Sequence, residues 1–298
     1  MKIVQSQWTK PGKKNDQLSA DDNKGGWIEK KYNYFSWALS VLQLKKYYNN
    51  IELVTDKAGY DLLINKLELP YDSVKTVLDE LNVYPEELFM MGKVYAYSIQ
   101  DEPFIHVDSD VFIWDKFDSK LENSPLICQS KEDEEFYNQH YFEIFYPMLK
   151  NFDFCPPYLE KSMIKNGRIV AVNAGIIGGQ DFEFYKNYKN QVFEFVERNV
   201  AHFEKVELKK TNIVFEQFLF HAMAEEQLMD INYLSLGNYT FLSDILDFTG
   251  VPEKIKYMHL YAGHKKVKLY LDGLEYRLQK DHPAYYYKII NLLKTNQI

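Results

Sequence analysis

The sequence has 298 residues, of which 46% are hydrophobic and 26% charged, and its net charge is −8. A chain of this length and composition can bury the core of one globular domain. The acidic charge, without a long basic run, argues against binding of nucleic acids. The 24 tyrosines, 20 phenylalanines and 4 tryptophans suit a surface that binds sugars or bases, or simply an aromatic core.

The cysteines and the apolar runs indicate where the protein works. Cys128 and Cys155 are far apart and form no Cys-x-x-Cys pair. This argues against a disulfide framework and a thiolate zinc site, and predicts a reducing compartment. The first residues turn polar before a signal-length apolar segment forms, and no run approaches the roughly 18 apolar residues of a membrane span. We therefore expect a cytoplasmic protein without a transmembrane segment.

Short apolar strands alternate with segments of helical periodicity, which predicts an α/β fold with a mostly parallel central sheet flanked by helices. In chain order, strands are expected at residues 2–7, 51–54, 104–107, 126–129, 169–172 and 256–260. Helices are expected at residues 32–48, 58–67, 85–99, 183–198, 213–226 and 285–293, with Asp56 capping the second and Pro85 at the start of the third. Residues 134–158 are aromatic, interrupted by prolines and predicted to be irregular.

Two aspartates follow the apolar strand at residues 104–107. Asp108 and Asp110 stand at the carboxyl end of a strand, where an α/β sheet binds its ligands. If the chain is extended there, the two carboxylates point to the same side. Paired carboxylates suit Mg²⁺ or Mn²⁺, whose remaining positions substrate phosphates can fill. Acidic pairs usually lie in solvated turns, but the apolar residues on both sides favour a metal site here.

Two further polar groups have both a functional and a structural explanation. Asn173 and Gly175 are expected in a glycine-rich turn after a strand, where the backbone can approach a ligand or simply connect tightly to a helix. Glu216 and Gln217 interrupt an apolar helical segment. They are therefore either part of a site or buried residues with hydrogen-bond partners.

A late segment combines histidine, glycine and lysine. His259 lies in the strand at residues 256–260, and Gly263, Lys265 and Lys266 follow it. The imidazole is a candidate third metal ligand, and the lysines are candidate ligands of phosphate oxygens. The alternatives are a packed strand histidine at this position and His264 as the metal ligand.

The order of these motifs resembles the retaining, GT-A-fold glycosyltransferases of the family-8 type, which include lipopolysaccharide galactosyl- and glucosyltransferases and the glycogenins. Those proteins carry Asp-x-Asp after a buried strand, an Asn-Ala-Gly turn, an acidic-Gln pair and a late His-Phe-x-Gly-x-x-Lys-Pro-Trp segment. The resemblance extends from the first strand to about Lys266. This chain departs from the pattern by having Glu before Gln217, one more residue between His259 and Gly263, and no Pro-Trp after the lysines.

The resemblance implies a metal-dependent transfer of a sugar, with retention, from a nucleotide sugar, expected to be a UDP-sugar. The acceptor is an unknown carbohydrate, lipid-linked or peptide group. Mn²⁺, or Mg²⁺, would be held by Asp108, Asp110 and His259. The residues implied to contact the donor are Trp8, Lys93, Asp108, Gly175, Gly263, Lys265 and Lys266. Asn173 and Glu216 would hold the donor sugar. Gln217 would face the anomeric carbon as a stabiliser, because an amide is a poor nucleophile.

We expect one glycosyltransferase-like domain. Its nucleotide-binding half covers residues 1–130, its acceptor and donor-sugar half residues 131–270, and its helical tail residues 271–298. The aromatic stretch 136–146 is a candidate acceptor wall, or a helix packed by aromatic side chains. Two rival functions stay open: a non-catalytic nucleotide-sugar-binding protein of the same fold, and a sugar nucleotidyltransferase. A glycosidase is disfavoured, since it needs neither a metal nor a diphosphate site.

Overall fold

The computed structural model describes residues 1–12, 24–234 and 245–298. The strands are β1 (Lys2–Gln7), β2 (Ile51–Thr55), β3 (Ser73–Thr76), β4 (Phe104–Val107), β5 (Val111–Ile113), β6 (Leu126–Glu132), β7 (Ala171–Gly179), β8 (Ile231–Tyr233) and β9 (Tyr257–His259). The helices are α1 (Lys30–Leu44), α2 (Lys57–Tyr60), α3 (Met91–Ser98), α4 (Ser119–Glu122), α5 (Glu135–Asn151), α6 (Pro157–Asn166), α7 (Phe182–Glu197), α8 (Leu208–Ile213), α9 (Leu219–Glu226), α10 (Lys268–Asp281) and α11 (Pro283–Lys294).

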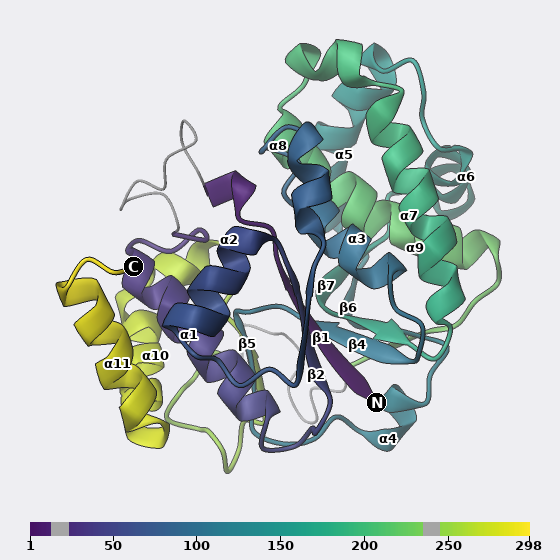
Figure 1. Cartoon of the computed structure of the whole chain (residues 1–298). Coiled ribbons are helices and arrows are strands. Elements are labelled where there is room, and N and C mark those ends of the chain that lie inside the picture. Colours follow the sequence, from purple (N-terminus) through teal and green to yellow (C-terminus); the bar gives the residue numbers. More distant parts are fainter. Residues whose placement is uncertain (13–23, 235–244) are drawn as a thin grey trace. The chain divides into compact units, whose positions relative to one another are not determined.

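The fold is the predicted α/β arrangement of a sheet with flanking helices (Figure 1). Seven strands form one sheet in the order β3-β2-β1-β4-β7-β6-β8, and β5 and β9 form a separate antiparallel pair. The pairs β1–β2, β2–β3 and β6–β8 are parallel, whereas β6–β7 is antiparallel. The prediction of a mostly parallel sheet is therefore confirmed. Within the three described stretches, no helix has the length and apolar character that a membrane span requires.

The chain divides into two compact units. The β1 unit comprises the described residues of Lys2–Asn82, Val107–Phe117 and Ser235–Ile298. The β6 unit comprises Met1, Val83–His106 and Asp118–Leu234. The domain boundaries expected at residues 130 and 270 stay a prediction.

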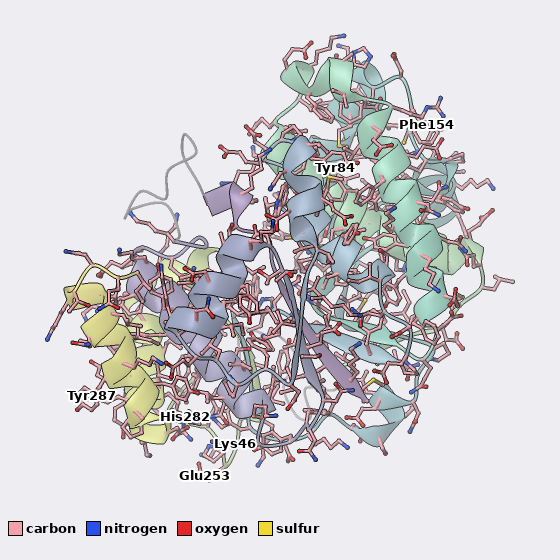
Figure 2. The ribbon with its side chains drawn as sticks, in the orientation of Figure 1. Lys46, Tyr84, Phe154, Glu253, His282 and Tyr287 are labelled. Atoms are coloured by element: carbon pink, nitrogen blue, oxygen red, sulfur yellow. The ribbon has the colours of Figure 1, made fainter. Side chains whose placement is uncertain are left out.

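In the β1 unit, α1 is buried on every side. It contacts β5 and the last two helices, α10 and α11 (Figure 1), and its residues from Tyr32 to Leu44 are all buried. A helix that is covered all round has no solvated polar face. Its polar side chains instead make specific hydrogen bonds; Gln5 Nε2, for example, donates to Ser40 Oγ at 3.0 Å. By contrast, Tyr287 of α11, labelled in Figure 2, is 60% exposed.

In the β6 unit, two glycines at the end of β7 let neighbouring backbones approach closely. A Cβ atom on Gly178 would lie 2.1 Å from the carbonyl oxygen of Phe104, and one on Gly179 would lie 2.1 Å from that of Pro125. The buried Tyr185 hydroxyl donates to the Gly178 carbonyl at 2.7 Å. These glycines therefore serve the packing of neighbouring segments.

Two labelled aromatic residues tie loops of the β6 unit to α7 (Figure 2). The Tyr84 hydroxyl donates to Glu197 Oε1 at 2.5 Å, and its ring packs edge-on against Phe193. The Phe154 ring lies 4.0 Å from the Arg198 guanidinium carbon. The segments before α3 and after α5 are thereby held against the end of α7.

The prediction of an irregular segment at residues 134–158 is wrong. This region contains α5, whose buried residues Tyr141, Ile144, Phe145 and Met148 recur at helical spacing. The helix of the alternative is therefore present, with Tyr141 and Phe145 as its buried aromatic residues; the acceptor wall stays a prediction. The prolines misled the prediction because Pro147 lies inside the helix, where proline usually interrupts the backbone hydrogen bonds.

Two boundaries also differ from the prediction. β7 continues to Gly179, so Asn173 and Gly175 lie in a buried strand and not in a turn. Pro85 does not begin a helix; α3 begins at Met91. The predicted cap is confirmed, because Asp56 Oδ1 accepts a hydrogen bond from the Gly59 amide at the start of α2.

Candidate functional site

Asp108 and Asp110 lie in a turn that directly follows β4. The Val111 amide donates to the Asp108 carbonyl oxygen at 3.0 Å, which closes the turn. The expectation of an extended chain at these residues is therefore wrong. The two carboxylates nevertheless lie close together, with one oxygen of each within 4.8 Å of the other.

Helix α1 holds this turn in place with two serine hydroxyls. Ser36 Oγ donates to the Ser109 carbonyl at 2.6 Å, and Ser40 Oγ donates to the Val111 carbonyl at 2.7 Å. Residues four apart lie on one face of a helix, so both hydroxyls meet the same loop. Each bond gives a partner to a backbone carbonyl oxygen of the loop.

Pairing of β9 with β5 brings His259 to the two aspartates. His259 stands opposite Val111 in the antiparallel register, and the Leu260 amide donates to the Asp110 carbonyl at 3.0 Å. The His259 Nε2 atom lies 3.3 Å from Asp110 Oδ1. One ligand atom from each of Asp108, Asp110 and His259 lies within 4.8 Å of the others. The three residues predicted as metal ligands are thus together.

Lys265 completes this cluster. Its Nζ lies 2.7 Å from Asp110 Oδ2, donates to the Gly25 carbonyl at 3.1 Å and lies 5.4 Å from the centre of the Trp27 ring. Burial disfavours the charged form of Asp110, but the charges of Lys265 and His259 outweigh it and hold the pKa of this carboxyl well below its usual range. Asp110 is therefore ionised at neutral pH.

The other late residues do not join the cluster in the same way. Gly263 and Lys266 are exposed in the short 3₁₀ turn at Ala262–Lys266. A Cβ on Gly263 would meet no atom within 4 Å. Of the two lysines predicted to meet phosphate oxygens, Lys265 alone makes the contact with Asp110 among the described ion pairs.

Trp8 follows β1 as Asp108 follows β4. Ligands of open α/β sheets bind beyond the carboxyl ends of the strands. The Trp8 side chain is 8% exposed, and its indole Nε1 donates to Asn82 Oδ1 at 3.1 Å. Little of the Trp8 side chain is therefore accessible to a ligand.

In the β6 unit, Glu216 and Lys93 form a buried ion pair. Glu216 lies in a π-helical turn, η5 (Val214–Phe218), and is fully buried. Lys93 Nζ of α3 lies 2.6 Å from Glu216 Oε1, which also accepts from the Tyr97 hydroxyl at 3.3 Å. The lysine keeps 13% of its side chain exposed. Lys93, rather than Glu216, is therefore the member of the pair that presents surface.

Gln217 is half-buried, and its side chain meets the Tyr141 hydroxyl. The same hydroxyl donates to Glu132 Oε2 at 2.7 Å, and Glu132 Oε1 accepts from Asn173 Nδ2 at 3.2 Å. Asn173 Oδ1 in turn accepts from the Gly175 amide at 3.0 Å. The predicted residues Asn173, Gly175 and Gln217 thus belong to one hydrogen-bonded chain.

The sequence did not single out Glu132 or Tyr141 as members of this chain. Tyr141 lay in a segment predicted to be irregular, and Glu132 lies three residues beyond the predicted end of its strand, residues 126–129. One signal was available: Cys128, Ser130 and Glu132 share a face if the strand continues.

The model of a family of unknown function, DUF6734, matches residues 1–292. A comparison with curated proteins finds no match.

Several solved structures are similar to the chain. Mouse xyloside xylosyltransferase 1 is 12% identical with a TM-score of 0.41, covering 89% of this chain and 99% of that protein. The glycosyltransferase GlyE of Streptococcus pneumoniae TIGR4 is 11% identical with a TM-score of 0.41, covering 99% of this chain and 64% of that one. An LgtC variant is 11% identical with a TM-score of 0.39, covering 72% and 70%.

Proposed function

The chain belongs to the family of unknown function DUF6734, and we propose that it is a metal-dependent glycosyltransferase. It moves a sugar, with retention, from a nucleotide-diphosphate sugar such as a UDP-sugar to an acceptor. The observation that carries this proposal is the convergence of Asp108, Asp110 and His259, whose ligand atoms lie within 4.8 Å of one another. Lys265, 2.7 Å from Asp110, adds a cation for phosphate oxygens.

The three side chains fit a divalent cation. Two carboxylates and one imidazole suit Mn²⁺ better than Mg²⁺, which favours oxygen ligands. Ligand atoms about 2.1 Å from one ion are about 3 Å apart at right angles and about 4.2 Å apart when opposite. The ligand atoms of the cluster lie within 4.8 Å of one another, and His259 Nε2 lies 3.3 Å from Asp110 Oδ1. A bound ion would offset the negative charge that develops on the departing nucleoside diphosphate.

In the β1 unit, the residues of this chain bind and orient the diphosphate. Asp110 stays ionised because Lys265 and His259 lie beside it. The Lys265 ammonium exchanges its contact with Asp110 for a diphosphate oxygen, a charge-assisted bond of similar kind. We assign Trp8 to the edge of the nucleoside pocket, and Gly263 and Lys266 to the exposed rim of the diphosphate site.

In the β6 unit, we assign the donor sugar to Lys93, Asn173, Gly175 and Gln217. Glu216 is fully buried, so we give it the role of fixing Lys93 rather than of meeting sugar hydroxyls itself. Gln217 is the half-buried member of an otherwise buried polar group, and it stabilises the positive charge that builds at the anomeric carbon. An interaction made only in the transition state raises turnover without tightening substrate binding.

The products distinguish this function from its rivals. The protein is incubated with Mn²⁺ and a panel of nucleotide sugars, without acceptor, and the nucleotides are separated by liquid chromatography. We expect release of nucleoside diphosphate from one donor. Release of pyrophosphate from a sugar phosphate and a nucleoside triphosphate would identify a nucleotidyltransferase instead. Tight donor binding without turnover, whatever the acceptor supplied, would favour the binding protein.

Two variants test the metal site directly. Asp108→Asn and Asp110→Asn keep the shape of each side chain but remove its charge, so each should lower Mn²⁺-dependent donor affinity and reduce turnover about 10²–10³-fold. Calorimetry measures the affinity, and circular dichroism checks the fold. Undiminished metal-dependent donor binding in both folded variants would remove the assignment.

A further inference from the structure

A buried tyrosine connects Gln217 to a carboxylate. Tyr141 on α5 is 1% exposed, and its hydroxyl donates to Glu132 Oε2 at 2.7 Å. The hydroxyl also lies within hydrogen-bond distance of Gln217 Oε1. Both partners approach the same oxygen, so the single hydroxyl proton decides the pattern of hydrogen bonds.

A tyrosine hydroxyl has one proton to donate and lone pairs with which to accept. Burial, together with the charge of Glu132, raises the pKa of Tyr141 well above its ordinary value, so the hydroxyl keeps its proton. Bonds to a charged acceptor are roughly twice as strong as those between neutral groups. The proton therefore lies on the Glu132 side, and the tyrosine oxygen is an acceptor on the Gln217 side.

The Gln217 amide can satisfy that acceptor only with its NH₂ group. An amide oxygen facing the lone pairs of the tyrosine oxygen would be repelled, whereas a half-turn of the amide places Nε2 against the tyrosine. Oε1 of Gln217 then points to the opposite side of the amide. Glu132 is itself fixed, because its second oxygen accepts from Asn173 Nδ2 at 3.2 Å.

We propose that Tyr141 and Glu132 are positioning residues that hold the Gln217 amide with its NH₂ group toward Tyr141 and its oxygen free for the reacting sugar. This inference rests on the proposed function for the identity of the sugar site. The amide oxygen, the electron-rich end of the group, then faces the anomeric carbon, where positive charge builds as the nucleoside diphosphate leaves. No covalent bond to the protein is needed.

The kinetic test uses Tyr141→Phe, which removes one oxygen and keeps the ring. We expect kcat for donor hydrolysis to fall about tenfold while the donor KM stays nearly unchanged. In a Gln217→Ala background, Tyr141→Phe should have no further effect on kcat, since the group that it orients is gone. An equal loss of kcat in both backgrounds would overturn the proposal.

A matched control removes a different buried hydroxyl. The Tyr185 hydroxyl donates to the Gly178 carbonyl at 2.7 Å and is equally buried, but among the described contacts it has none with Gln217. Tyr185→Phe should leave kcat unchanged. If Tyr141→Phe does not fold, Glu132→Gln replaces it: loss of the charge frees the tyrosine proton for Gln217, and kcat should fall in the same way.

A second readout does not depend on turnover. In ¹⁵N-labelled protein, the side-chain NH₂ of Gln217 should exchange slowly with solvent when it is bound to Tyr141, and quickly in Tyr141→Phe. The signal is assigned by its loss in Gln217→Ala. If exchange is slow in the parent and fast in Tyr141→Phe, the orientation of the amide is supported. If the parent at the same time shows no turnover, the proposed function is contradicted. Exchange that is unaffected by Tyr141→Phe overturns the orientation itself.

Discussion

Replacing Lys265 by methionine should tighten metal binding and weaken donor binding. Lys265 Nζ lies 2.7 Å from Asp110 Oδ2, so a divalent cation that enters the Asp108–Asp110–His259 cluster must compete with the lysine for this carboxylate. The same lysine is our candidate for a diphosphate oxygen. Loss of Lys265 should therefore raise the affinity for the metal and lower the affinity for the donor.

The structure sets the size of the first effect. The two side chains are 17% and 10% exposed, so solvent screens their attraction only in part. A hydrogen bond to a charged group contributes about 1.5–3 kcal/mol net, and each 1.4 kcal/mol is about tenfold in Kd. In Lys265→Met, the Kd for Mn²⁺ without donor should fall about 10- to 100-fold. With saturating Mn²⁺, the donor Kd should rise at least about tenfold.

Isothermal titration calorimetry at pH 7.5 measures both constants. Lys268→Met is the matched control, because Lys268 loses the same charge from an exposed ion pair with Asp272 at 2.6 Å, where little energy is at stake. An unchanged or weaker Mn²⁺ affinity in folded Lys265→Met would refute the competition. A higher Mn²⁺ affinity with an unchanged donor affinity would support the competition between Lys265 and the metal, but it would remove Lys265 from the diphosphate site.

Three further measurements test other parts of the structure. His259→Ala should weaken Mn²⁺ binding at least about tenfold by calorimetry, whereas His264→Ala should not, because His264 lies outside the candidate cluster formed by described residues. Burial lowers the pKa of His221 to about 4 from 6.5; the unfolded chain takes up the proton first, so stability should fall by up to about 3 kcal/mol between pH 6.5 and pH 4. Urea unfolding of His221→Gln should not show this loss of stability between pH 6.5 and pH 4. Gly178→Ala should destabilise the protein by at least about 1–3 kcal/mol in the same assay, since its Cβ would lie 2.1 Å from the Phe104 carbonyl oxygen, a backbone atom that cannot move alone.

Alternation of apolar strands with helical periodicity was sufficient to predict the α/β fold, because both signals come from side chains that the core must bury. β3 was missed because none of its residues is buried, so its sequence carries no apolar pattern. α5 was missed because the prolines in this segment suggested an irregular chain, although its aromatic residues recur at helical spacing. Pairing with β2 for β3, and packing against α8, η4 (Val200–Lys205) and η5 for α5, decided the structure rather than local preference.

The metal cluster was predicted from a local geometry that the structure does not have. An extended Asp108-Ser109-Asp110 was expected, yet the segment turns, and the hydroxyls of Ser36 and Ser40 hold it in place. The predicted cluster is nevertheless present, because the turn also leaves the two carboxylates within 4.8 Å of each other. The local sequence does not indicate that these two serines hold the turn, because a serine in a buried helix usually forms its hydrogen bond within its own helix.

The Tyr141–Glu132 pair shows why part of the candidate site lay beyond sequence reasoning. The sequence separates Glu132 from Gln217 by 85 positions, and Tyr141 reaches both only because α5 contacts the π-helical turn η5. Each of these residues alone has an ordinary explanation: a charge at a strand end, an aromatic residue in a core, a polar residue in a helix. Their proposed role depends on the one hydroxyl proton of Tyr141, which can be donated to Glu132 or to Gln217 but not to both. The contact among these three side chains is visible only in the tertiary structure. Once the proton is assigned to Glu132, the orientation of the Gln217 amide follows.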